Sequence, residues 1–278
     1  MLRSLMGKMI CWYCKYRGGL YIKLGQILSN QKASFSYEFT KELETLQHNI
    51  KHNLTQSELD TLLSKIHPDI QNVSIVEAGS VAVVFKGEVN GGVVAIKIVR
   101  PNIHETVKTQ EKSITWWVNK LDYYYPQYFL SHKWKRIYKI LLEQLDMNNE
   151  AANMNFFHTH HKSLYVTIPK SYDVYSTQSQ LVMDWVDGVT LTQIESLQLD
   201  EETKKTLASK YAMFLKESHE YGYVHMDLHP GNIMITQQHD MAIIDFGLVA
   251  KYESSKSKQF FQLIDSSFQN NPERFADT

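Results

Sequence analysis

The sequence contains few cysteines, no long apolar run and almost no net charge. Its 278 residues include only two cysteines, Cys11 and Cys14, and the formal net charge at pH 7 is −1. A single C-x-x-C pair is a poor zinc site, and no strand-like segment precedes it as in a thioredoxin motif. No run of about 18 apolar residues is present, so a transmembrane helix is not expected. The near-neutral charge gives no reason to expect nucleic acid as a partner.

Acidic residues are absent from the N-terminal stretch that precedes Glu38. Between its apolar side chains this stretch carries the basic residues Arg3, Lys8, Lys15, Arg17, Lys23 and Lys32. The pattern is typical of a transit peptide, of a helix on a membrane surface, or of the solvated first helix of a domain. We favour the domain helix because the next motif begins soon afterwards. A peripheral contact with a membrane surface stays as an alternative, and the compartment is left open.

Helical periodicity dominates the first part of the chain. A composition of 43% hydrophobic and 21% charged residues is that of an ordinary globular protein, and the length suffices for one large or two ordinary domains. Apolar residues at helical spacing predict helices over Leu20–Gln31, from Ser36 onwards and over Ser57–Ile66. Three helices are therefore expected before the first strand.

A change to β-branched residues predicts a sheet after these helices. Strands are expected over Val73–Val89 and Val93–Val99, joined by the turn Asn90-Gly91-Gly92, because glycine tolerates positive φ. The second strand contains Val94-Ala95-Ile96-Lys97, the pattern of a strand whose lysine contacts nucleotide phosphates. A lysine on a buried strand needs a paired charge. Its candidate carboxylate partners in the following helices are Glu105, Glu111, Glu143 and Glu150.

The middle of the chain is expected to contain long helices and further strands. The helices are predicted over Asn102–Tyr123 and His132–His158, and the strands over Leu164–Ile168, Ser171–Tyr175 and Gln180–Trp185. The last strand breaks into a turn at Gly188, as expected of a hinge between two lobes. Backbone groups of Asp184 and Val186 are candidates there for hydrogen bonds to an adenine edge. An amphipathic helix over Glu201–Tyr221 then ends at Gly222.

A short polar stretch further along carries the strongest chemical signal. His225, Asp227 and Asn232 have the H-x-D-x-x-x-x-N spacing of a kinase catalytic loop, and Asp245-Phe246-Gly247 follows as a D-F-G motif. The apolar segments 232–236 and 241–244 predict a hairpin that brings Asn232 and Asp245 together. Their oxygen atoms suit Mg²⁺, which prefers carboxylates, waters and phosphate oxygens. Asp227 then remains to accept a proton or to orient a nucleophile.

Taken together, these motifs resemble the UbiB family, the atypical protein-kinase-like proteins with an aarF domain (ADCK). Lys23-Leu24-Gly25-Gln26 is similar to the K-x-G-Q signature of the family, and Glu77-Ala78-Gly79-Ser80 stands where the family has an alanine-rich loop. The other matching positions are the nucleotide lysine Lys97, the E-x-D signature at Gln144-Leu145-Asp146, the lysine partner Glu150, the loop from His225 to Asn232, and Asp245.

The resemblance implies an α+β, two-lobed protein-kinase-like fold. We expect an N-terminal helical extension over residues 1–70, an N-lobe with inserted helices over 71–187, and a shortened helical C-lobe over 188–278, either natural or a fragment. The resemblance also implies ATP and Mg²⁺ as cofactors and a partner connected with prenylated quinone lipids and coenzyme Q biosynthesis. The nucleotide-binding positions it implies, together with the two hinge candidates, are Ala78, Gly79, Ser80, Lys97, Asp184, Val186, Lys23 and Gln26.

Two residues depart from the family pattern. Gln144 replaces the first acid of E-x-D, which removes a charged contact to the helix of Lys23. Gly79 interrupts the alanine run, and its missing side chain lets backbone N–H groups approach phosphate closely. Nucleotide affinity is therefore expected to be nearer to that of an ordinary kinase.

The expected function is that of an ATP- and Mg²⁺-dependent phosphotransferase or ATPase with an unidentified acceptor. The expected catalytic residues are Asp227, Lys97 and Glu150, and the expected metal ligands are Asn232 and Asp245. One alternative is an ordinary protein Ser/Thr kinase, which Met226 opposes because an arginine usually stands there to read activation-loop phosphate. Another is a catalytically weak scaffold that senses nucleotide.

Overall fold

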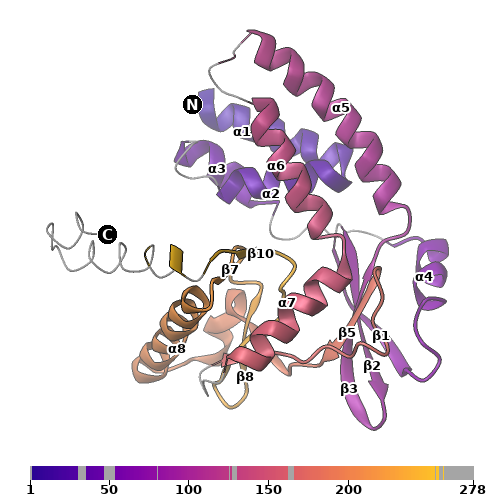
Figure 1. The fold of residues 1–278 in the computed structure, drawn as a ribbon, viewed down its shortest axis with the longest axis vertical. Helices are drawn as coiled ribbons and strands as arrows, with labels where there is room; N and C mark the ends of the chain where they lie inside the picture. The colour runs from indigo at the N-terminus through magenta and orange to yellow at the C-terminus, as the bar shows by residue number, and fades with distance from the viewer. Residues whose placement is uncertain are drawn as a thin grey trace, which may run out of the picture. The chain divides into compact units, whose positions relative to one another are not determined.

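The computed structural model describes residues 2–30, 36–46, 54–79, 81–124, 126, 130–161 and 166–253, together with 255, 256 and 259 (Figure 1). The chain divides into two compact units. The first contains Met1–Met147 and Thr177–Leu181, and the second contains Asn148–Ser176 and Val182–Thr278. Both units combine helices with strands, so the predicted α+β fold class is confirmed. The division at residues 70 and 187 stays a prediction.

Helices open the first unit, where α1 Leu2–Arg17, α2 Gly19–Asn30 and α3 Tyr37–Glu44 pack on one another (Figure 1). The core between them contains Leu20 of α2, Leu43 of α3 and Leu46, which follows α3. Gly25 of α2 lets the chain pass close to this core, because a Cβ at its position would lie 2.2 Å from the Leu46 Cδ1 atom. The glycine of the K-x-G-Q signature is therefore a packing residue.

Two further helices of the first unit continue this layer. α5 Ile103–Tyr124 contacts α2, and α6 Leu130–Glu143 contacts α5. The buried Gln110 of α5 accepts a hydrogen bond from the Leu20 N–H group at 2.8 Å and donates one to the Arg17 carbonyl at 3.2 Å. These bonds satisfy backbone groups at the corner between α1 and α2, where helical partners are missing.

The sheet of the first unit follows the predicted β pattern. β1 Gln71–Ala78, β2 Ala82–Val89 and β3 Gly92–Val99 are antiparallel neighbours, and β5 Gln180–Asp184, of which Gln180 and Leu181 belong to this unit, follows β3 in the sheet order. The predicted turn between β2 and β3 is present, with positive φ at Asn90 and Gly91. α4 Gln56–Leu63 precedes the sheet and begins with a capping box between Thr55 and Glu58.

The second unit is built around a core of aromatic side chains. Its helices are α7 Met147–His160, η2 Leu191–Leu197, a 3₁₀ helix, and α8 Glu201–Glu220. Its strands are β4 Val166–Thr167, β6 Gly188–Thr190, β7 Tyr223–His225, β8 Ile233–Thr236, β9 Met241–Ile243 and β10 Val249–Lys251. One sheet has the order β4-β9-β8-β6, and β7 pairs with β10. The rings of Phe157, Phe214 and Phe246 are fully buried at the centre of the unit.

The number of helices differs from the prediction in two places. Four helices precede β1, because α1 confirms the favoured N-terminal domain helix, which the count of three helices from Leu20 onwards did not include. The single helix predicted over His132–His158 is two helices, α6 and α7, with a break around Gln144. At this break the Met147 N–H group donates to the Gln178 carbonyl at 3.0 Å instead of to a helical carbonyl. Because the Met147 N–H group is bonded outside the helix, the hydrogen-bond series of α6 does not continue into α7.

Gly188→Ala is expected to destabilise the second unit, because a Cβ at Gly188 would lie 2.4 Å from the Ile235 carbonyl oxygen. That oxygen belongs to the backbone of β8, which pairs with β6, so the two strands would have to separate. We expect a loss of about 1–3 kcal/mol in the free energy of unfolding, measured in urea. Gly92→Ala is the control, since its Cβ would lie 3.6 Å from the Val89 carbonyl oxygen. Equal stability of the two variants would contradict the steric argument.

Candidate functional site

The predicted hairpin forms one edge of the candidate site. β8 and β9 are antiparallel, with Ile233 opposite Ile243, and the Ile244 N–H group donates to the Asn232 carbonyl at 3.1 Å. This register places Asn232 next to the residue that precedes Asp245. The two proposed metal ligands are therefore neighbours at one end of the hairpin, as the apolar pattern predicts.

The amide of Asn232 has a defined orientation. The side chain is 8% exposed, and its Nδ2–H donates to the Asp227 carbonyl at 2.9 Å. With the nitrogen engaged, Oδ1 accepts no hydrogen bond from the part of the chain that the structure describes. An amide oxygen held in this way is a suitable ligand for a hard cation.

A buried histidine joins the H-x-D-x-x-x-x-N loop to the D-F-G segment. The ring of His225 donates from Nε2 to the Asp245 carbonyl, and its Nδ1 accepts from the Asp227 N–H group at 3.2 Å. These two bonds require the neutral ring, and burial lowers the pKa of His225 accordingly. His225 therefore ties the backbones of Asp227 and Asp245 together.

Two carboxylates approach the turn at Gly247. The Gly247 N–H group donates to Asp245 Oδ1 at 2.9 Å. A Cβ at Gly247 would lie 3.3 Å from this oxygen and 3.4 Å from Oε2 of Glu150, which is 1% exposed. Glu150 thus lies close to the D-F-G segment within the second unit. Its predicted partner Lys97 belongs to the first unit, so that pairing stays a prediction.

The oxygen ligands at the hairpin end fit Mg²⁺ better than a zinc ion. Among the described residues, no group of three or more His, Cys, Asp or Glu side chains is arranged to hold a metal ion. Asn232 Oδ1 and the Asp245 carboxylate offer two hard oxygen donors on adjacent segments. Mg²⁺ commonly binds through one or two protein ligands and takes its others from water and phosphate.

In the first unit, an arginine that the sequence did not single out holds the loop before β2. Arg100 donates from Nε to the Gly79 carbonyl at 2.8 Å and from its backbone N–H to the Val81 carbonyl at 2.9 Å. The Gly79 N–H group donates to the Ala82 carbonyl at 2.9 Å. Ala78 ends β1 just before Gly79, and Ser80 lies outside the described residues.

The K-x-G-Q residues have contacts within the helical layer. Gln26 donates from Nε2 to the Leu46 carbonyl at 2.8 Å. Lys23 lies on α2, but its side chain is outside the described residues. Gln144, in the E-x-D position, is half-buried, and its Oε1 has no hydrogen-bond partner in the described part of the chain. The described bond of Gln26 is structural, and its nucleotide role stays a proposal.

The two hinge residues differ in what their backbones can offer. The Asp184 N–H group already donates to the Lys170 carbonyl at 3.0 Å. Its carboxylate accepts from the Lys170 N–H group and from the Tyr172 hydroxyl. The Asp184 N–H group is therefore not available to an adenine edge, and the contact predicted for Val186 stays a prediction. The strand predicted over Ser171–Tyr175 is a turn, because the Tyr175 N–H group donates to the Tyr172 carbonyl.

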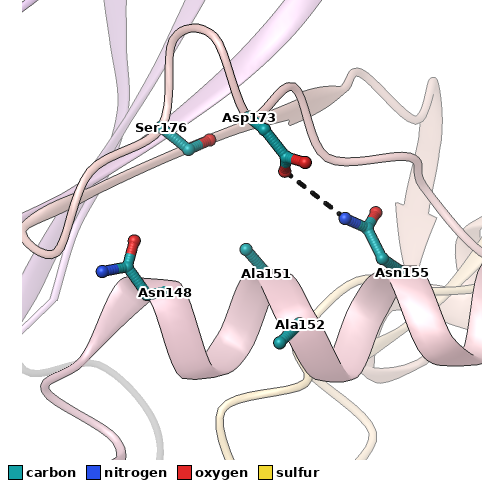
Figure 2. A pocket seen from close by; sticks show the side chains of 6 residues that line it. All are labelled: Asn148, Ala151, Ala152, Asn155, Asp173 and Ser176. Carbon is teal, nitrogen blue, oxygen red and sulfur yellow. Dashed lines mark hydrogen bonds between the residues drawn. The ribbon is translucent and has the colours of Figure 1, made fainter.

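The opposite face of α7 from Glu150 lines a separate pocket of about 310 Å³ (Figure 2). Its wall consists of Asn148, Ala151, Ala152, Asn155, Asp173 and Ser176. Figure 2 shows Asn155 pointing toward Asp173, to whose carboxylate it donates at 3.4 Å. None of the site residues predicted from the sequence lines this pocket.

Comparison with known proteins identifies the matching family and its members. The ABC1 atypical kinase-like domain matches residues 38–278. The chloroplastic protein ACTIVITY OF BC1 COMPLEX KINASE 7 of Arabidopsis thaliana is 26% identical over 274 residues, covering 92% of this chain and 39% of that protein. The probable protein kinase UbiB of Histophilus somni is 26% identical over 288 residues, covering 93% and 51%. The chain thus spans about half or less of the length of these relatives.

A solved structure supports the same fold. The complex of Rv3197 with erythromycin from Mycobacterium tuberculosis matches with a TM-score of 0.62 at 22% identity, over 90% of this chain and 67% of that chain. None of the helices in the described ranges combines the length and apolar character needed to cross a bilayer. The domain match covers most of the chain and includes the catalytic loop and the D-F-G segment. The chain therefore belongs to the ABC1 atypical kinase-like family, which confirms its resemblance to UbiB and aarF-domain proteins.

Proposed function

We propose that this chain binds ATP together with Mg²⁺ and transfers the terminal phosphoryl group to water or to another acceptor. The observation that carries the proposal is the end of the β8–β9 hairpin. Asn232 and Asp245 are neighbours there, and the backbone of Asp227 is held by bonds from Asn232 and to His225. A protein that catalyses phosphoryl transfer contributes mainly positioning and charge stabilisation. This arrangement supports the positioning, and the proposed Mg²⁺ would supply positive charge.

Each polar residue has a distinct role in the proposal. Asn232 Oδ1 and the Asp245 carboxylate would hold Mg²⁺, which when bound neutralises charge on phosphate oxygens. Asp227 orients the attacking hydroxyl or water and accepts its proton. Lys97 supplies a fixed cation to the phosphates, and Glu150 is proposed to orient it. The half-buried position of Lys97 on β3 supports this proposal, because a lysine charge in such a position is stabilised by anionic groups.

The remaining predicted contacts complete the nucleotide site. Backbone groups of Ala78 and Gly79 are proposed to approach the phosphates, and Val186 the adenine edge. Lys23 and Gln26 are proposed to restrict entry of a peptide. We also propose a prenylated quinone lipid as the phosphoryl acceptor or as a regulator, and this proposal rests on the family resemblance alone.

An ordinary protein kinase is less well supported. Met226, in place of the usual arginine, is 53% exposed and offers no charge to an activation-loop phosphate.

The test is ATP binding and phosphate release by the purified chain, with Mg²⁺ and with EDTA. Lys97→Met is expected to lower turnover by about 10²-fold or more, because it removes a fixed cation from the transition state. Lys204→Met is the control, since Lys204 lies on the exposed face of α8 in a surface ion pair with Glu201. Binding without turnover would favour the nucleotide-sensing scaffold. Labelling of a protein substrate would favour the ordinary kinase. Absence of Mg²⁺-dependent binding in the unaltered chain would refute the proposal.

A further inference from the structure

A buried asparagine of α7 contacts the D-F-G segment directly. Asn153 is 1% exposed and lies one helical turn after Glu150. Its Nδ2–H donates to the Phe246 carbonyl at 3.0 Å, across 93 positions of sequence. The two consecutive carbonyls of Asp245 and Phe246 are therefore both held by buried side chains, the first by His225 and the second by Asn153.

Stability alone does not account for this asparagine. Its Oδ1 is buried and has no hydrogen-bond partner in the described part of the chain. A buried amide oxygen without a hydrogen bond lowers the stability of the folded protein. An apolar side chain of similar size at this position would avoid that loss of stability. The bond to the Phe246 carbonyl is the feature that only an amide at this position provides.

The geometry of one peptide group links this bond to the metal ligand. The Phe246 carbonyl and the Gly247 N–H group belong to the same planar peptide unit. Asn153 holds the oxygen of that plane, and the N–H on the other side donates to Asp245 Oδ1 at 2.9 Å. Glycine tolerates the backbone angles that a flipped plane would require, so Gly247 itself offers little resistance to such a flip.

We propose that Asn153 is a positioning residue that keeps Asp245 in its metal-binding orientation by holding the Phe246–Gly247 peptide plane. The inference rests on the proposed function, in which Asp245 holds Mg²⁺. When the Phe246 carbonyl is released, the plane can rotate and the Gly247 N–H group leaves the Asp245 carboxylate. The carboxylate then loses one of the bonds that fix its orientation, and a less preorganised ligand binds Mg²⁺ more weakly.

The test compares Asn153→Leu with Asn155→Leu. Asn155 lies on the pocket face of the same helix, where its amide donates to Asp173 and accepts from the Ser171 N–H group at 3.3 Å and makes no bond to the D-F-G segment (Figure 2). ATP binding is measured by calorimetry across a Mg²⁺ titration. Asn153→Leu is expected to raise the half-saturating Mg²⁺ concentration by about tenfold, the effect of one lost hydrogen bond. Binding of ATP in EDTA should not change, and Asn155→Leu should behave as the unaltered protein.

A second measurement needs neither metal nor nucleotide. Hydrogen exchange of the segment 244–248 is expected to be faster in metal-free Asn153→Leu than in the unaltered protein or in Asn155→Leu. If Asn153→Leu does not fold, Asn153→Ser is used, since it also lacks a donor that reaches Phe246.

Unchanged Mg²⁺ dependence together with unchanged exchange in a folded Asn153 variant would overturn the inference. If the unaltered chain showed no Mg²⁺-dependent binding, the proposed function would fail. The exchange experiment would still decide whether Asn153 holds the peptide plane.

Discussion

Asp245→Asn is expected to abolish Mg²⁺-dependent ATP binding and turnover. The substitution removes the only formal negative charge among the two proposed metal ligands, while Oδ1 can still accept the Gly247 N–H group. The turn at Gly247 should therefore persist when the metal is lost. We expect the dissociation constant for ATP with Mg²⁺ to rise at least about 100-fold, because altering even outer-shell groups of metal sites costs about 10–100-fold.

The measurement is calorimetric titration with ATP in Mg²⁺ and in EDTA. Asp240→Asn is the matched control, because it removes a carboxylate from the same hairpin at its opposite end. Asp240 is exposed and its ion pair with Lys210, at 2.7 Å, is a surface contact. If Asp245→Asn bound ATP with normal Mg²⁺ dependence, the assignment of Asp245 as a metal ligand would be wrong.

Phe157→Ala is expected to lower the free energy of unfolding of the second unit by about 3–5 kcal/mol. The Phe157 ring is fully buried, with its centroid 5.0 Å from that of Phe246 and 5.7 Å from that of Phe214. Its loss would leave a cavity between α7, α8 and the D-F-G segment. A domain of ordinary stability has only about 5–15 kcal/mol in total, so the variant should be close to unfolding.

Urea denaturation followed by circular dichroism measures this loss. Val174→Ala is the control, because Val174 is 84% exposed and its truncation should change stability by at most about 0.5 kcal/mol. A change below about 1 kcal/mol in Phe157→Ala would show that the three rings do not form the core of the unit. Such a result would also weaken the argument that α7 holds the D-F-G segment in place.

The local sequence pattern was sufficient to predict several structural elements of this protein. The hairpin of β8 and β9 follows from two short apolar segments on either side of a polar turn. The turn at Asn90 and Gly91 follows from residues that tolerate positive φ. The adjacency of Asn232 and Asp245 could be predicted because both flank one short hairpin, where register is set by nearby residues.

Sequence spacing was not sufficient to predict features that depend on a single long-range hydrogen bond, such as the end of a helix or the position of a loop. The break between α6 and α7 depends on a bond from Met147 to Gln178, across 31 positions of chain. The helical spacing of apolar residues continues through this break, because both helices bury apolar side chains, and the sequence therefore predicted a single helix. The fixation of the loop before β2 by Arg100 depends in the same way on a neighbouring strand.

The sequence by itself determined the order and spacing of the chemical groups, and through them the family. Only the tertiary structure decided how those groups are held. His225 reaches the Asp245 carbonyl across 20 positions, and Asn153 reaches the Phe246 carbonyl across 93. The reason is physical: a hydrogen bond between distant segments depends on how helix and hairpin pack, and no local propensity encodes that packing.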